Sequence, residues 1–134
     1  MKDKNDLVKA WLRKAENDLR TAIHALETME SPPTDTICFH AQQCAEKYLK
    51  AFLIFHEVDF PYTHKLEALI LLCAKKDDDF ADLEPEVERL TPFAAEFRYP
   101  GDTDEVSVEY AAEAIKTARK VKNFVLSKLS RLPA

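Results

Sequence analysis

The sequence predicts an all-α domain, an antiparallel up-and-down bundle of four long helices with one short additional helix. The chain of 134 residues contains a single glycine. The usual share is about 7%, and a sheet protein would need more glycine for its tight turns. Apolar residues recur every three or four positions in five segments, which is the helical period. Short connections between the segments favour antiparallel neighbours, and we expect one domain over residues 1–134.

The first helix is expected over about residues 7–29, where the apolar residues share one face. Asn5 or Asp6 is expected to cap its start, because short polar side chains accept hydrogen bonds from the first backbone N–H groups. Pro32 and Pro33 follow, and two prolines cannot continue a helix.

The second helix is expected to begin after Thr34, as its cap, and to run to about His56. Its apolar stripe is wide, so we place this helix centrally in the bundle. A loop over residues 59–63 then leads to a shorter third helix over about residues 64–75, which ends in a polar connector.

The fourth helix is expected from about Phe80 or Pro85 to Arg98. Proline fits the first helical turn at Pro85, but Pro92 lies further in and should kink or split the helix. The fifth helix is expected over about residues 105–129, where apolar residues again follow the helical period.

The only glycine lies in a turn that joins Arg98 and Tyr99 to the fifth helix, in the order Arg98, Tyr99, Pro100, Gly101. Proline fixes φ and glycine permits positive φ, which suits a type II turn between two helices. Such a turn does not require arginine, whose five donors suit phosphate or carboxylate. Arg98 and Tyr99 are therefore the leading binding candidates. The alternative is that Arg98 only interacts favourably with the negative end of the helix dipole, while Tyr99 packs on the turn.

A second group of candidates comprises Glu46, Lys47, Lys50 and His64. The three helical residues are predicted to share a face, where lysines beside a glutamate could hold a phosphate near a general base. A solvated Glu46–Lys50 salt bridge is the alternative. His64 could exchange protons with a nucleotide or RNA ligand, or only cap the third helix.

Composition excludes several kinds of site. No glycine-rich phosphate loop exists, so P-loop and Rossmann folds are excluded and we expect no cofactor. His40 and Cys44 have a spacing that can chelate zinc, but no second pair accompanies them, and we expect no metal site. Cys38 and Cys73 have no evident activating partner.

Charge and hydropathy restrict the compartment and the partners. The net charge of −5 and the pI near 5.4 disfavour broad nucleic-acid binding but leave room for a local basic site. No apolar run approaches the roughly 20 residues of a membrane span. An odd number of cysteines without a secretion signal predicts reduced thiols in the cytoplasm.

Four motifs give the chain a resemblance to a known family. They are AENDL at 15–19, FHAQQCAEKYLKA at 39–51, THKL at 63–66 and RYPG at 98–101. Together they resemble the small prokaryotic HEPN domains, over about residues 7–129. The resemblance implies a helical bundle that is commonly dimeric, a nucleotide-binding role, and a minimal nucleotidyltransferase as partner. Such pairs can act as toxin and antitoxin.

Many other members of that superfamily are metal-independent RNases, and their motif is an arginine and a histidine separated by four to six residues. After Arg98 the corresponding positions hold Thr103, Asp104 and Glu105, so the motif is incomplete. An RNase with a degenerate site would need His64, or Tyr99, to move protons.

Our first hypothesis is a non-catalytic bundle that dimerises and binds a nucleotide or a nucleotidyltransferase near Arg98 and Tyr99. The degenerate RNase toxin is the second hypothesis. The third is an adaptor that binds protein through spare apolar surface, because spacing alone cannot place every large aromatic residue in one core. The same surplus, together with the resemblance, predicts a homodimer. The surplus aromatic residues are Trp11, Phe55, Phe60 and Phe124.

Overall fold

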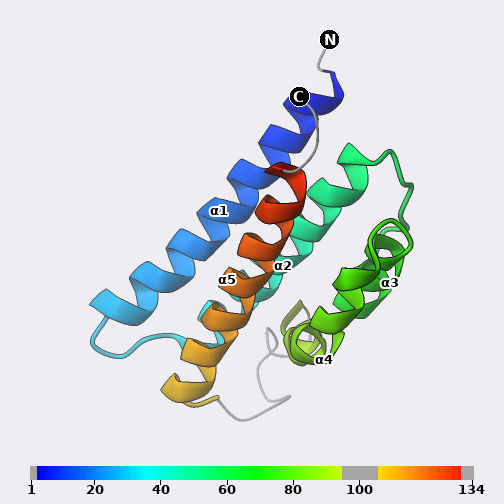
Figure 1. The fold of residues 1–134 in the computed structure, drawn as a ribbon. Helices are drawn as coiled ribbons and strands as arrows, with labels where there is room; N and C mark the ends of the chain where they lie inside the picture. The colour runs from blue at the N-terminus through cyan, green and yellow to red at the C-terminus, as the bar shows by residue number, and fades with distance from the viewer. Residues whose placement is uncertain (1–2, 95–105, 131–134) are drawn as a thin grey trace.

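The computed structural model describes residues 3–94 and 106–130, and these residues form helices without any β-strand. The predicted all-α bundle is therefore confirmed. Its helices in chain order are α1 (Lys4–Thr28), α2 (Thr34–Phe55), α3 (Leu66–Ala74), a short α4 (Glu84–Val87) and α5 (Val108–Ser130). Figure 1 shows α1 running antiparallel to α2, with α5 packed along both and α3 and α4 on the far side of α2.

The core lies around α2, as the width of its apolar stripe predicts. Fully buried alanines occur on each long helix and allow close approach of the backbones, for example Ala15, Ala41 and Ala118. Larger side chains such as Leu49 and Phe52 fill the space between α2 and the α3–α4 side of the bundle. The close packing of these helices fixes where the polar residues of α2 lie.

The expected caps at the first two helix starts are wrong. Asp3 caps α1 and accepts a hydrogen bond from the backbone N–H of Asp6 at 2.8 Å, so Asn5 and Asp6 lie inside the first turn. Thr34 is the first residue of α2 rather than its cap, and Pro33 precedes it without any side-chain cap. The difference is one to three residues, because several polar residues compete at each start.

The end of α2 is closed by a Schellman motif. The N–H of Val58 donates to the carbonyl of Leu53 at 2.9 Å, and that of Glu57 donates to Ile54 at 3.0 Å. Glu57 takes φ of 56°, a left-handed conformation that usually favours glycine. This reversal starts the loop that carries His64 back toward α2.

The fourth predicted helix is split, as expected from Pro92, but most of it is 3₁₀ rather than α-helix. It consists of two 3₁₀ segments, η1 (Asp78–Leu83) and η2 (Glu88–Ala94), on either side of α4. Pro85 lies in the first turn of α4, as expected, and Pro92 lies inside η2. Proline lacks an N–H donor and clashes with the preceding turn, which explains why a regular α-helix does not continue. The turn at residues 98–102 lies outside the described residues.

The surplus aromatic rings are partly buried, and lysine ammonium groups cover them. The distances to the ring centroids are 4.9 Å for Lys4 over Phe55, 5.7 Å for Lys50 over Trp11, 5.6 Å for Lys50 over Phe60 and 5.3 Å for Lys128 over Phe124. These aromatic rings, which the sequence left unassigned, therefore each lie beside a lysine ammonium group. Within residues 3–94 and 106–130, none of the helices has the length and apolarity that crossing a membrane requires.

Candidate functional site

A polar stripe runs along the buried side of α2. Gln42, Glu46 and Lys50 follow one another at intervals of four residues, and all three are buried. Burying such groups is costly unless each one finds a partner. Within the described residues, no buried side-chain nitrogen or oxygen lacks a hydrogen-bond partner. The stripe is therefore a satisfied network rather than a defect in the core.

The Glu46 carboxylate is the centre of this network. Its Oε2 accepts a hydrogen bond from Lys50 Nζ at 2.9 Å. Its Oε1 lies 3.0 Å from Gln42 Nε2 and 2.9 Å from His64 Nδ1. Gln42 also donates to the backbone carbonyl of His64 at 3.1 Å, which docks the loop on α2. We call these four residues the α2 network.

The arrangement gives His64 a defined orientation. Because Nδ1 faces a carboxylate, this nitrogen carries a proton and donates it in the hydrogen bond to Glu46. The His64 side chain is 43% exposed and its ring centroid lies 5.5 Å from that of Tyr62, so part of the ring is open to solvent or ligand. A histidine that a buried carboxylate orients in this way is suited to proton transfer.

A second polar group joins α1 to α2. Asp18 accepts hydrogen bonds from Lys47 Nζ at 2.6 Å and from His40 Nδ1 at 2.8 Å. Burial raises the pKa of Asp18, but the hydrogen bonds from His40 and Lys47 outweigh it, so the pKa lies below its usual value. His40 is thus engaged with Asp18, while Cys44 is buried in the core.

The structure brings together only part of the predicted site. Glu46, Lys50 and His64 meet, but the Glu46–Lys50 pair is buried rather than solvated, and His64 binds Glu46 instead of capping α3. Lys47 does not join them, because its ammonium is held by Asp18 on α1. The remaining candidates, Arg98 and Tyr99, lie outside the described residues.

A hollow of about 440 Å³ opens beside these groups. Its lining comprises Leu7, Ala10, Trp11, Lys14 and Lys47, and we call it the Trp11 hollow. Its size lies within the range of small-molecule sites. An indole can stack on a base, and two lysines can attract phosphate.

The Trp11 hollow adjoins both polar groups. Lys47 connects it to Asp18, and the Lys50 ammonium over the Trp11 ring connects it to Glu46. The sequence does not reveal the hollow, because Trp11 belongs to the surplus aromatic residues and nothing in the helical period marks Lys14. The usable signal was their spacing of three residues, which places an aromatic ring and a cation side by side on a helix.

The cysteines provide no nucleophile. Cys38, Cys44 and Cys73 are fully buried, as predicted for core thiols. Burial raises the pKa of Cys38 to about 12, and it also raises the pKa of Cys44 and Cys73 well above their usual value. A thiol that stays protonated is a poor nucleophile.

Comparison with known proteins gives one family and two solved structures. A family model described as the HEPN domain matches residues 8–129. The crystal structure of ST0689, an archaeal HEPN homologue, has a TM-score of 0.73 at 27% identity, over 96% of this chain and 98% of that one. That of TT1696 from Thermus thermophilus has a TM-score of 0.72 at 26% identity, over 90% and 97%. No curated protein matches.

Proposed function

We propose that this chain, which belongs to the HEPN domain family, is a binding module that holds a nucleotide in the Trp11 hollow. The observation that carries the proposal is the lining of the hollow, where one indole lies beside two lysines. A nucleotide needs the same two things from a protein, a flat surface for its base and positive charge for its phosphates.

The two lysines contribute differently. Asp18 holds the Lys47 ammonium in place at 2.6 Å, so its position is fixed before any ligand arrives. Lys14 is exposed and has no ion-pair partner within the described residues, so its charge is available. We therefore propose that Lys14 contacts the phosphates and that the base stacks on Trp11. Lys47 lines the hollow beside both.

The partners belong to the same proposal. Its support is the family, together with the RYPG motif at 98–101 that resembles the small prokaryotic members. On this basis the chain forms a homodimer in the cytoplasm and pairs with a minimal nucleotidyltransferase, as one half of a toxin–antitoxin system. Arg98→Ala then weakens binding of nucleotide or partner while helicity is unchanged. An unchanged affinity, measured by calorimetry, would mean that Arg98 takes no part in binding.

Nucleotide binding can be tested with ATP as the probe, because Trp11 is the only tryptophan and reports on the hollow directly. We expect ATP to quench its fluorescence. Lys14→Ala should raise the Kd about tenfold through the loss of one charge-assisted contact. Lys9→Ala is the matched control, since Lys9 is also exposed on α1 but does not line the hollow. Equal affinity in both variants, or no quenching at all, contradicts the proposal.

One observation favours a second function, metal-independent RNA cleavage. Glu46 orients His64, whose ring remains partly open, and this pair could move protons near a phosphate held by Arg98. The test is cleavage of RNA without added metal by the wild type, Arg98→Ala and His64→Ala. Cleavage that both variants lose makes the chain an enzyme. Its absence in the wild type leaves the binding module.

A further inference from the structure

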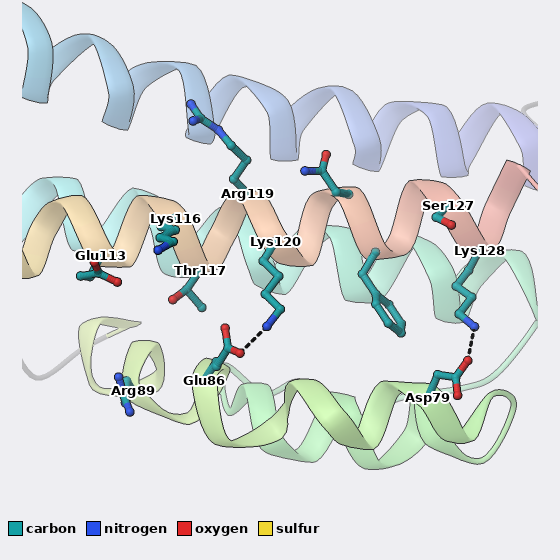
Figure 2. Close-up of a pocket in the computed structure, with 12 residues that line it drawn as sticks. Asp79, Glu86, Arg89, Glu113, Lys116, Thr117, Arg119, Lys120, Ser127 and Lys128 are labelled. Carbon is teal, nitrogen blue, oxygen red and sulfur yellow. Dashed lines mark hydrogen bonds and ion pairs between the residues drawn. The ribbon is translucent and has the colours of Figure 1, made fainter.

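A second hollow of about 940 Å³ lies between α5 and the segment from η1 to η2 (Figure 2). Five basic and three acidic side chains line it, so it carries a local excess of positive charge in a chain whose net charge is −5. We call it the α5 groove. Its charged lining residues are Asp79, Glu86, Arg89, Glu113, Lys116, Arg119, Lys120 and Lys128.

Two lysines of the groove form ion pairs with acidic residues of the chain itself. Lys120 pairs with Glu86, and Lys128 pairs with Asp79 at 2.7 Å and with Asp77 at 2.8 Å. Figure 2 shows Lys120 and Lys128 reaching across the groove from α5 to the opposite wall. These contacts resemble what a bound anion would make, except that the carboxylates belong to the protein itself.

Three further cations line the groove. Arg89 on η2, together with Lys116 and Arg119 on α5, has no ion-pair partner within residues 3–94 and 106–130. Figure 2 places Lys116 on the α5 wall and Arg89 on the opposite one, while Arg119 extends toward α1. Positive charge on both walls suits an anion that lies along the groove rather than one that touches a single side.

The neutral lining residues indicate which anion fits. Thr117, Asn123 and Ser127 add hydroxyl and amide donors between the lysines of α5. Lysine or arginine together with such donors is the usual set that contacts phosphate oxygens. From Glu113 to Lys128 the lining follows about 22 Å of helix at 1.5 Å per residue. That length accommodates several phosphates in a row and exceeds what one phosphate needs.

We propose that the α5 groove binds a linear chain of phosphate groups, and that Glu86 and Asp79 compete with this chain for Lys120 and Lys128. The site is separate from the Trp11 hollow and shares no lining residue with it. Binding replaces the Lys120–Glu86 and Lys128–Asp79 ion pairs by contacts with phosphate, so the segment from η1 to η2 acts as an internal competitor. The chain can come from single-stranded RNA or from inorganic polyphosphate.

The experiment measures binding of a labelled oligouridylate and of inorganic polyphosphate to the full chain by fluorescence anisotropy. Arg89→Ala with Lys116→Ala should weaken binding about tenfold or more. The matched control is Lys9→Ala with Arg13→Ala, which removes the same two residue types from exposed positions on α1. Circular dichroism verifies that both double variants keep their helicity.

Salt dependence separates specific contacts from net charge. For single strands, the slope of log K against log salt changes by about 0.7 per phosphate contact. The groove variant should therefore lose about 1.4 from its slope, while the α1 control keeps it. An equal loss of affinity in both double variants overturns the proposal, and so does a wild type that binds neither probe.

If the acidic residues compete with phosphate, removing one of them should strengthen binding rather than weaken it. Glu86→Gln frees Lys120, so it should strengthen binding several-fold, whereas a purely structural role for Glu86 predicts no gain. Binding of either probe that Glu86→Gln strengthens supports the proposal. The probe with the higher affinity per phosphate shows whether RNA or polyphosphate is the ligand. If poly-L-glutamate binds as tightly as polyphosphate, the phosphate assignment is overturned and an acidic protein segment takes its place.

Discussion

The α2 network and the α5 groove use the same chemical groups in opposite settings. The Lys50 and Glu46 side chains are 7% and 4% exposed, whereas those of Lys120 and Glu86 are 54% and 40% exposed. In the first setting each charge depends on its partner, because water cannot replace it. In the second, water and salt compete at every moment. Burial, rather than residue type, therefore separates a fixed part of the fold from an exchangeable surface.

Removing the centre of the α2 network should have the largest effect. Glu46→Ala leaves the Lys50 charge buried without its partner, and we expect a loss of about 3–5 kcal/mol in the free energy of unfolding. Urea denaturation measures it. Glu86→Ala is the exposed counterpart and should cost less than about 1 kcal/mol. Similar losses in the two variants would abolish the distinction between the regions.

Acid should weaken the α1–α2 contact through Asp18. Because the folded-state pKa of Asp18 is lowered, the unfolded chain binds more protons in acid. Its contribution is complete above the unfolded pKa, near 3.9, and is lost as pH falls through the folded pKa. Asp18→Asn should therefore cost about 2 kcal/mol at neutral pH and flatten the acid limb of stability against pH. An unchanged acid limb in urea titrations would contradict the assignment.

Replacing both members of the buried pair should cost less than replacing one. Glu46→Met with Lys50→Met removes both charges and keeps similar volume, so we expect stability within about 1 kcal/mol of the wild type. The same urea denaturation checks it against Glu46→Ala. A double variant as unstable as the single one would mean that the hydrogen bonds of Gln42 and His64 to Glu46 matter more than the buried charge.

The smallest effect should come from the exposed pair. Glu86→Gln breaks the contact with Lys120 and should cost less than about 1 kcal/mol at low salt. Near 1 M salt the Debye length is about 3 Å, so the difference from the wild type should vanish. Thermal unfolding at two salt concentrations measures this. A difference that persists in high salt would mean that Glu86 acts through packing.

The fold could be predicted because helical periodicity and the single glycine are local properties of the sequence. The split of the fourth helix is expected from Pro92, but the apolar period does not reveal that most of this segment is 3₁₀ rather than α-helix. Within the site, Glu46 and Lys50 form a local pair that spacing reveals, while the contact of His64 with Glu46 depends on how the loop folds back. The contact of Lys47 with Asp18 on α1 joins residues far apart in the chain, so spacing along α2 could not reveal it.

The α2 network also affects how this sequence can evolve. The Glu46 carboxylate contacts Gln42, Lys50 and His64, so a change at Glu46 leaves buried donors of Gln42 and Lys50 without this partner. Replacing these residues one at a time produces an unstable intermediate sequence, whereas replacing them together does not. Among relatives that keep this bundle, the four positions should vary together or stay the same. Covariation of these positions among relatives would then reflect the buried contacts between them.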